Sequence, residues 1–253
     1  MSKPKEIELH VGHFGDGTGA AGHIDEVKEA RKVTKRVYDI LKANKVPSTF
    51  FEDGTSKNRT QNINSLIKHH NADRDGLIVS IHFNAGGDGT KAIGTEVLYY
   101  SEKALADKLA KAISNATGEG LKNRGSKQRK DLGVLAKTYE PAVLIEVCFV
   151  NSSIDVAIYR RDFEKICQAI AKVLATEIGY SIGQSNTPVP PPAKKEEEEV
   201  AKFLNETGRK ECREMIKRGV EEKLFTSDHK NVDKYDDTEL LSYSMAYINR
   251  KNK

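Results

Sequence analysis

Three short segments of this chain carry side chains that could hold and use a metal ion. They are Gly12-His13 with Glu26 after it, Ser80 to Asn84, and Leu144 to Val147. Two neutral imidazoles and one carboxylate, with a fourth position left open, form a ligand set of catalytic zinc. A second carboxylate is then free to act as a base on water at the metal. The residue types therefore predict a zinc hydrolase.

Taken singly, each histidine also has an ordinary explanation. His13 lies in a glycine-rich stretch and could be a solvent-exposed loop residue, with Gly12 allowing a sharp turn out of a strand. His82 ends an apolar run, where a lone histidine is more often a satisfied core residue, because burying it unpaired costs roughly 1–3 kcal/mol. The presence of both histidines together with a carboxylate favours the metal site.

The carboxylates leave one choice open. Glu146 lies between Ile145 and Val147 in an apolar strand, and buried carboxylates are rare unless they are paired or close to a metal. Glu146 could act as a base whose pKa is adjusted by its surroundings, and the alternative is that it forms a structural ion pair. Glu26 and Glu29 compete for the third ligand position, because they lie one turn apart at the start of one predicted helix. The local pattern does not choose between them.

Alternating strand-like and helix-like segments must position these residues. The expected strands are 7–11, 48–51, 76–82, 95–100, 132–135 and 142–149, and the expected helices are 26–43, 58–70, about 102–116 with Ser101 as cap, and about 161–178. Repeated β-α-β units predict an α/β fold with a mainly parallel twisted sheet and helices on both faces. Ligand sites of such sheets lie at the carboxyl ends of the strands, where His13, His82 and Glu146 all occur.

The composition divides the 253 residues into three parts. Prolines followed by a Lys-Glu run predict a linker over 183–200, between a catalytic domain, 1–182, and a small helical domain, 201–253. Cys148, Cys167 and Cys212 form no CxxC pair and are expected to be packing residues.

Several function classes are disfavoured by the sequence. Forty-one Lys and Arg are mixed with 37 Asp and Glu, and without a basic stripe no nucleic-acid partner is expected. No run of about 18 apolar residues is present, so we expect no insertion into a membrane. The polar N-terminus lacks a signal-peptide core, and we expect synthesis in the cytoplasm.

The remaining histidines are not needed for the site. His23 is close to Glu26 in sequence and could support it from outside the ligand shell. His69 and His70 end a polar helix and are expected to be solvated. No role at the site is expected for His10 or His229.

About the first 180 residues resemble the zinc-dependent N-acetylmuramoyl-L-alanine amidases of the Amidase_3 class, found in bacterial autolysins and bacteriophage endolysins. The matching stretches are Gly12-His13, Gly19-Ala20 leading to Glu26, Ser80 to Ala85, Gly94 to Val97, and Pro141 to Asn151. The resemblance implies zinc ligands at His13, Glu26 and His82. It implies Glu146 as the catalytic residue, and its spacing prefers Glu26 over Glu29. The family often shows Asp-x-Gly-His-Gly-Gly where this chain has His10 to Gly15.

The implied function is hydrolysis of the amide bond between N-acetylmuramic acid and L-alanine in peptidoglycan by a phage or prophage endolysin, released from the host cytoplasm. Asn84 and Arg124 lie in expected loops from which they could contact substrate. Alternatives are a sporulation or mother-cell-lysis autolysin, a zinc carboxypeptidase acting on the stem peptide, and a non-catalytic wall-binding protein. The C-terminal domain would bind a cell-wall polymer, with self-association as its alternative.

Overall fold

The computed structural model describes residues 4–183, 206–225 and 231–235, together with residues 240, 243, 244, 247 and 251. The chain divides into two compact units, 1–185 and 186–253. Residues 184–200 of the predicted linker lie outside the described residues.

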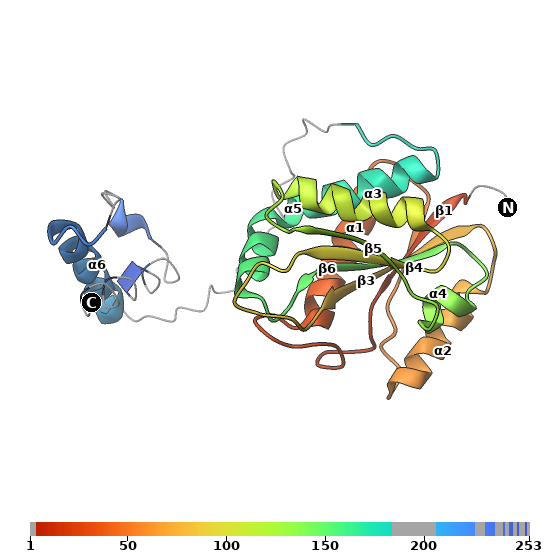
Figure 1. The fold of residues 1–253 in the computed structure, drawn as a ribbon, viewed down its shortest axis with the longest axis horizontal. Coiled ribbons are helices and arrows are strands. Elements are labelled where there is room, and N and C mark those ends of the chain that lie inside the picture. The colour runs from red at the N-terminus through yellow and green to blue at the C-terminus, as the bar shows by residue number, and fades with distance from the viewer. Residues whose placement is uncertain are drawn as a thin grey trace. The chain divides into compact units, whose positions relative to one another are not determined.

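The larger unit is built on one six-stranded sheet with the order β2-β1-β3-β6-β4-β5 (Figure 1). The strands are β1 (Glu6–Val11), β2 (Ser48–Phe51), β3 (Gly76–Asn84), β4 (Thr95–Tyr99), β5 (Asn123–Gln128) and β6 (Ala142–Phe149). Only β4 and β6 pair antiparallel within this sheet; the other neighbours are parallel. The predicted mainly parallel sheet is confirmed.

Helices cover both faces of the sheet, as the alternating pattern predicts. One face packs against α1 (Glu26–Ala43), α3 (Lys103–Ala116) and α5 (Ser153–Glu177), and the other against α2 (Arg59–His70) and α4 (Gly133–Lys137) (Figure 1). The first face carries the larger apolar core. The second carries a smaller cluster: Leu66, Ile78, Leu98, Val134, Leu135, Ala142 and Leu144. The predicted fold class is therefore confirmed.

Strand alternation explains why the two faces differ. In β1, Ile7, Leu9 and Val11 belong to the larger core. Glu8 and His10 point to the other face because successive side chains of a strand alternate, and both are buried there. The face below α2 and α4 is therefore partly polar, and the candidate residues His82 and Glu146 lie on it.

One predicted strand and one predicted helix cap were wrong, and one strand was missed. Residues 132–135 are not a strand but lie at α4, because a short apolar run does not distinguish a strand from a buried helical turn. The polar edge strand β5 was missed. Ser101 does not cap α3: Glu102 occupies the cap position, and the Ser101 hydroxyl donates a hydrogen bond to it.

The last helix, α5, begins eight residues before its predicted start, at Ser153. The Ser152 side chain caps it by accepting a hydrogen bond from the Asp155 backbone N–H. The helix contains a kink at Asp162, whose φ of −108° and ψ of 16° are not helical. The predicted start near 161 therefore lies at this kink.

The smaller unit contains α6 (Glu206–Glu221) and a 3₁₀ turn, η1 (Val232–Lys234). Cys212, Ile216, Val232 and Leu240 form its buried cluster. Much of the predicted small helical domain, 201–253, lies outside the described residues. All three cysteines are buried and free, as the packing interpretation predicts. In neither unit do the described helices include one that is apolar over a membrane-spanning length.

Asp155 joins three segments of the larger unit. Its fully buried carboxylate accepts hydrogen bonds from the backbone N–H groups of Ile93 and Gly94, each at 2.9 Å, and of Phe149 at 3.3 Å. The loop before β4, the end of β6 and the start of α5 are thus held by one side chain.

We predict that Asp155→Ala lowers the free energy of unfolding by about 2–4 kcal/mol, because it leaves buried backbone donors without an acceptor. Urea denaturation followed by circular dichroism measures this change. Asp39→Ala is the matched control, since Asp39 pairs only with exposed Lys35 one turn away, and it should cost about 0.5 kcal/mol or less. Equal losses in both variants would contradict the role given to Asp155.

Candidate metal centre

His13, Glu26 and His82 meet at the carboxyl edge of the sheet. β1 and β3 are parallel neighbours, with Val11 opposite Ile81, so the residues that follow share one edge. Glu26 is the first residue of α1, whose start is fixed by the Asp25 cap. One ligand atom from each of the three residues lies within 4.8 Å of the others.

The Glu26 carboxylate lies between the two imidazoles. Its Oε1 is 3.0 Å from His13 Nε2 and 2.9 Å from His82 Nδ1. Its Oε2 accepts a hydrogen bond from the Ala20 backbone N–H at 2.6 Å. Burial alone would raise the pKa of Glu26, but the hydrogen bonds with His13 and His82 hold it well below its usual range. The carboxylate is therefore fixed in place and ionised.

Glu29 lies away from this cluster. Its Oε2 accepts a hydrogen bond from the Tyr159 hydroxyl at 2.8 Å, and its Oε1 pairs with Lys32. The two carboxylates at the start of α1 thus serve different neighbours. Of the two candidates, the structure brings Glu26 to the imidazoles.

Two glycines leave space for these side chains. A Cβ on Gly12 would lie 2.4 Å from Cε1 of His82, and one on Gly19 would lie 2.7 Å from Oε2 of Glu26. Gly12 therefore permits the close approach of an imidazole rather than the sharp turn predicted from sequence. The turn itself is made by His13, with a φ of 65°.

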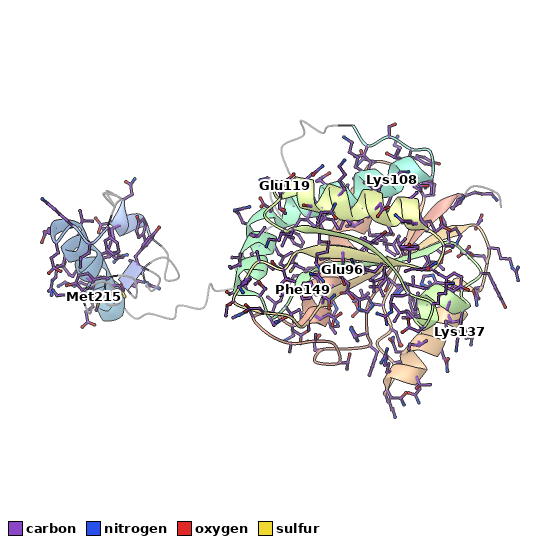
Figure 2. All side chains as sticks on the ribbon, in the orientation of Figure 1. Glu96, Lys108, Glu119, Lys137, Phe149 and Met215 are labelled. Atoms are coloured by element: carbon purple, nitrogen blue, oxygen red, sulfur yellow. The ribbon has the colours of Figure 1, made fainter. Side chains whose placement is uncertain are left out.

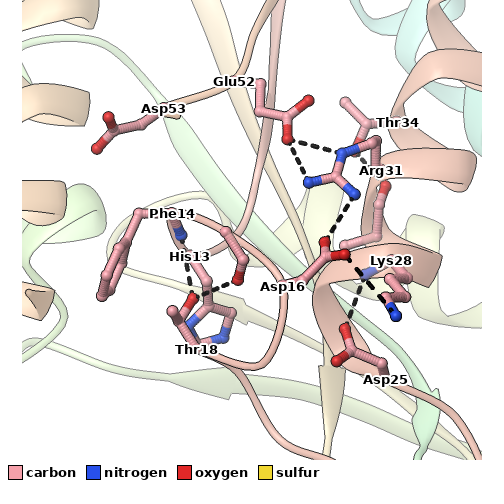
Figure 3. A network of polar contacts seen from close by, with 12 residues as sticks. His13, Phe14, Asp16, Thr18, Asp25, Lys28, Arg31, Thr34, Glu52 and Asp53 are labelled. Carbon is pink, nitrogen blue, oxygen red and sulfur yellow. Dashed lines mark hydrogen bonds and ion pairs between the residues drawn. The ribbon is translucent and has the colours of Figure 1, made fainter. Parts of the chain in front are cut away.

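The loop that follows His13 is held by polar contacts, shown in Figure 3. The Thr18 hydroxyl accepts from the Phe14 N–H at 3.3 Å and donates to the Gly15 carbonyl at 2.8 Å. Arg31 of α1 donates to Asp16 in the loop at 3.0 Å and to Glu52 beyond β2 at 2.7 Å. These contacts tie the loop to α1 and keep its geometry fixed.

Glu146 lies beside the cluster, directly opposite His82 in the β3–β6 register. Its Oε2 is buried and has no hydrogen-bond partner among the described residues. Burial, together with the charges of Glu26 and Glu96, raises the pKa of Glu146 to about 8. Burial also lowers the pKa of His82, so this imidazole is neutral, the form in which a histidine binds metal. The group thus combines candidate metal donors with a carboxyl group of high proton affinity.

These side chains open into a cavity of about 440 Å³ between the sheet, α2 and α4. His13, Glu26, His82 and Glu146 line it, with Asn84 beside them. Its apolar lining includes Ile63, Leu66, Leu98, Leu132, Val134 and Leu144. Such a cavity can take a ligand with both apolar and polar groups.

Two arginines that line the cavity were missed in the sequence. Arg59 is the first residue of α2, and Arg129 follows β5. Arg129 is held by Asp131 through two hydrogen bonds of 2.8 and 2.7 Å. Because β5 itself was not recognised, nothing in the local pattern placed Arg129 near the cluster.

The comparison with known protein families agrees with this geometry. The profile of the Amidase_3 family, described as N-acetylmuramoyl-L-alanine amidase, matches residues 7–176. The chain belongs to this family. The matched stretch includes His13, Glu26, His82 and Glu146 and covers the sheet that positions them. The resemblance stated from sequence is therefore confirmed at the level of the family.

Curated relatives and solved structures extend the match. The chain is 34% identical over 210 residues to an uncharacterised protein of Clostridium perfringens, covering 81% of this chain and 60% of that one. It is 32% identical over 171 residues to the endolysin of Bacillus phage SPP1, covering 62% and 59%. The catalytic domain of the CD27L endolysin targeting Clostridia Difficile matches with a TM-score of 0.59 at 26% identity, covering 71% of this chain and 99% of that domain. The chain spans between 50% and 60% of the length of the curated relatives it matches.

Asn84 and Arg124 share one partner in this amidase-family domain, Glu96 of β4. Glu96 Oε1 accepts from Asn84 Nδ2 at 2.9 Å, and Oε2 accepts from Arg124 Nε at 2.8 Å. Arg124 belongs to β5 rather than to the expected loop, and its guanidinium lies 5.1 Å from the Phe149 ring centre. Glu96 and Phe149, labelled in Figure 2, lie on the neighbouring strands β4 and β6. Asn84 is the last residue of β3 rather than a loop residue, and it lines the cavity with its amide oriented by Glu96. Arg124 is not among the described residues that line the cavity.

The other histidines depart from expectation in one case. The His23 side chain is exposed, and its backbone N–H donates to the Val150 carbonyl. His69 is exposed and stacks on Phe51 with ring centres 3.9 Å apart. His70 is buried rather than solvated, because α2 places it against a carboxylate of β1.

We predict that Gly12→Ala weakens metal binding at this candidate centre about 10- to 100-fold, because the new methyl group displaces the His82 imidazole. A loss of this size is typical of disturbed ligand support. Titration of the chelator-treated protein with zinc as the probe ion measures it. Gly54→Ala is the matched control, since a Cβ on Gly54 meets no atom within 4 Å. Equal zinc affinity in the two variants would contradict the close approach at Gly12.

Proposed function

We propose that this chain is a zinc-dependent peptidoglycan amidase that hydrolyses the amide bond between N-acetylmuramic acid and L-alanine. The observation that carries the proposal is the meeting of His13, Glu26 and His82 beside Glu146 in one cavity. Membership of the amidase family supports the bond that is cleaved.

The donor set fits zinc. Donors about 2.0–2.1 Å from a tetrahedral zinc ion lie roughly 3.3 Å from one another. The Glu26 Oε1 atom lies 2.9 and 3.0 Å from the two imidazole nitrogens, so a shift of a few tenths of an ångström suffices. Two nitrogens and one carboxylate also leave a position open for substrate. Zinc bound there would polarise the scissile carbonyl and lower the pKa of water.

Glu146 supplies the proton transfers in the proposed mechanism. Its Oε2 takes a proton from the attacking water and later passes it to the departing L-alanine nitrogen. Burial beside Glu26 and Glu96 raises the pKa of this carboxyl to about 8, and the positive charge of zinc bound at the neighbouring ligands would lower it again, leaving the carboxylate ionised to accept the proton. Asn84 lies on the same cavity wall with a fixed amide and is positioned to bind substrate.

We predict that Glu146→Gln lowers kcat on purified cell walls by at least about 100-fold while zinc stays bound, because the general base is lost. His82→Ala should lose both zinc and activity. Metal analysis and release of new termini measure the two properties. Glu119→Gln, an exposed carboxylate elsewhere in the fold, is the control with unchanged activity. Wall lysis by Glu146→Gln at the rate of the unchanged protein would refute the assignment.

The products distinguish this reaction from its rivals. An amidase frees a muramoyl carboxyl group and an N-terminal L-alanine, whereas a zinc carboxypeptidase frees a residue of the stem peptide. A non-catalytic wall-binding protein releases neither. Digestion of purified peptidoglycan with and without chelator, with identification of the new termini, separates the three.

The biological role that we propose is that of a phage or prophage endolysin acting on the cell wall after release. The endolysins among the matching proteins support it. A sporulation or mother-cell-lysis autolysin with the same chemistry is the alternative. The neighbouring genes distinguish the two roles, because holin and phage structural genes would accompany an endolysin.

We further propose that residues 201–253 bind a cell-wall polymer, with self-association as the competing role. The described part of the smaller unit has a small buried cluster of its own. We predict that the full chain pellets with purified walls more strongly than a 1–182 truncation. Co-sedimentation with walls measures this, and sedimentation velocity without walls tests for a dimer. Equal pelleting of the two proteins would contradict wall binding by the tail.

A further inference from the structure

A second group of acidic side chains lies on the α2 face of the sheet, toward the amino ends of the parallel strands. Glu8 belongs to β1, Asp73 precedes β3, and Glu140 precedes β6. One carboxylate oxygen from each lies within 4.8 Å of the others. Glu8 is 4% exposed and Glu140 is 7% exposed, whereas Asp73 is at the surface. Two of the three carboxylates are thus removed from water.

Glu8 shares a chain of hydrogen bonds with two buried histidines. His70 Nδ1 pairs with Glu8 Oε2, and His70 Nε2 lies 2.8 Å from His10 Nδ1. Burial lowers the pKa of His70 to about 4 and that of His10 well below its usual range, so both rings are neutral. Two arrangements satisfy both contacts. With Glu8 ionised, His10 donates to His70 and His70 donates to Glu8; with Glu8 protonated, Glu8 donates to His70 and His70 donates to His10. Cation binding requires the first arrangement, in which the chain of donors ends on the Glu8 carboxylate.

One oxygen of each buried carboxylate has no partner. Glu140 Oε1 accepts from the Gly76 N–H at 2.6 Å, but Glu140 Oε2 and Glu8 Oε1 are buried without a hydrogen bond among the described residues. A Cβ on Gly76 would lie 2.1 Å from Glu8 Oε1, so glycine permits this oxygen its position. When both carboxyls are ionised, these two oxygens therefore share a buried site that supplies them no donor.

The surroundings add negative rather than positive charge. Glu6 and Asp75 form a second acidic set with Asp73. Lys5 pairs with Asp75, and within residues 4–183 no lysine or arginine forms an ion pair with Glu8 or Glu140. Buried charges in proteins are paired or coordinate a metal. The group lacks a positive charge.

We propose that Glu8, Asp73 and Glu140 bind a hard divalent cation of the Ca²⁺ or Mg²⁺ class, at a site separate from the His13–Glu26–His82 centre. Oxygen-only donors select such ions, while imidazole and thiolate favour transition metals. The His70 ring holds the Glu8 carboxylate from behind, the usual support for a metal ligand. Exposed Asp73 provides the entry from solvent, and water would complete the shell. The bound ion would join β1 to the loops before β3 and β6.

Protons compete with the cation for these oxygens. Burial raises the pKa of Glu8 and of Glu140 to about 7. As the pH falls below about 7, this pair of carboxyls takes up protons and the site loses negative charge. Cation binding should therefore be strong at pH 8 and lost at pH 5, because the protonated carboxyls no longer attract the ion.

The test uses the full chain with its zinc centre already saturated. We expect equilibrium dialysis to give one Ca²⁺ per chain at pH 8, and Ca²⁺ or Mg²⁺ to raise the Tm by several degrees. Both effects should vanish at pH 5. Glu140→Gln should abolish them at pH 8 while zinc content is unchanged; its amide oxygen can still accept from Gly76, which keeps the fold. Glu119→Gln should retain both effects.

A shared proton is the competing state of the same two carboxyls. It predicts no effect of Ca²⁺ or Mg²⁺ at pH 8, together with a stability that falls as pH rises through about 7, since the raised pKa then disfavours the folded state. That result overturns the cation site. Equal Ca²⁺ stoichiometry in Glu140→Gln and the unchanged protein also overturns it. Neither outcome bears on wall hydrolysis, which the zinc centre alone would perform.

Discussion

The parallel register of β1, β3 and β6 is the constraint on which the candidate centre depends. Val11 lies opposite Ile81, and His82 lies opposite Glu146. Because parallel strands end at a common edge, side chains from distant parts of the sequence reach one place there. The remaining donor, Glu26, comes from the start of α1, where the Asp25 cap fixes the first turn. A one-residue slip in any pair would turn a side chain to the opposite face.

Alternation along the strands separates packing from chemistry. The face below α1, α3 and α5 buries an apolar core, with Leu9, Val79 and Ile145 among its members. The opposite face carries polar groups at alternate positions: Glu8, His10, Ser80, His82 and Glu146. Stability thus comes mainly from one face. The opposite face contributes less to the apolar core, so its strands can carry buried polar side chains.

Much of the fold could be predicted, because long periodic segments leave little choice. The limits of α1 and β2 match their expected ranges, since each shows an unbroken pattern between clear boundary residues. The polar β5 could not be found, because its sequence, Asn123–Gln128, has no apolar alternation and its pairing to β4 is a tertiary contact. The short run at 132–135 fits a strand or a helical turn equally well.

The candidate site could likewise be predicted only in part. Residue type and strand ends were enough to select His13, His82 and Glu146, whereas the choice of Glu26 needed family spacing. The local sequence contained no sign that Gly12 accommodates an imidazole, because that contact joins two strands. His70 was misplaced for the same reason: a polar helix end looks solvated, but its partner Glu8 is 62 residues away.

Glu26 and Glu8 are both buried carboxylates, but the pKa of Glu26 falls and the pKa of Glu8 rises. At the carboxyl edge, Glu26 has two imidazoles against one oxygen, and its pKa falls despite burial. Toward the amino edge, Glu8 has a single imidazole and faces Glu140, and both pKa values rise to about 7. Burial is common to both groups, so the sign is decided by the neighbours: imidazoles around Glu26 lower its pKa, and the negative charge of Asp73 beside Glu8 and Glu140 adds to the effect of burial. A carboxylate with enough donors stays charged and ready to bind a metal. A buried carboxylate without such donors must take up a proton or a cation from solvent. Asp73 is exposed, so a proton or a cation can reach Glu8 and Glu140 past it.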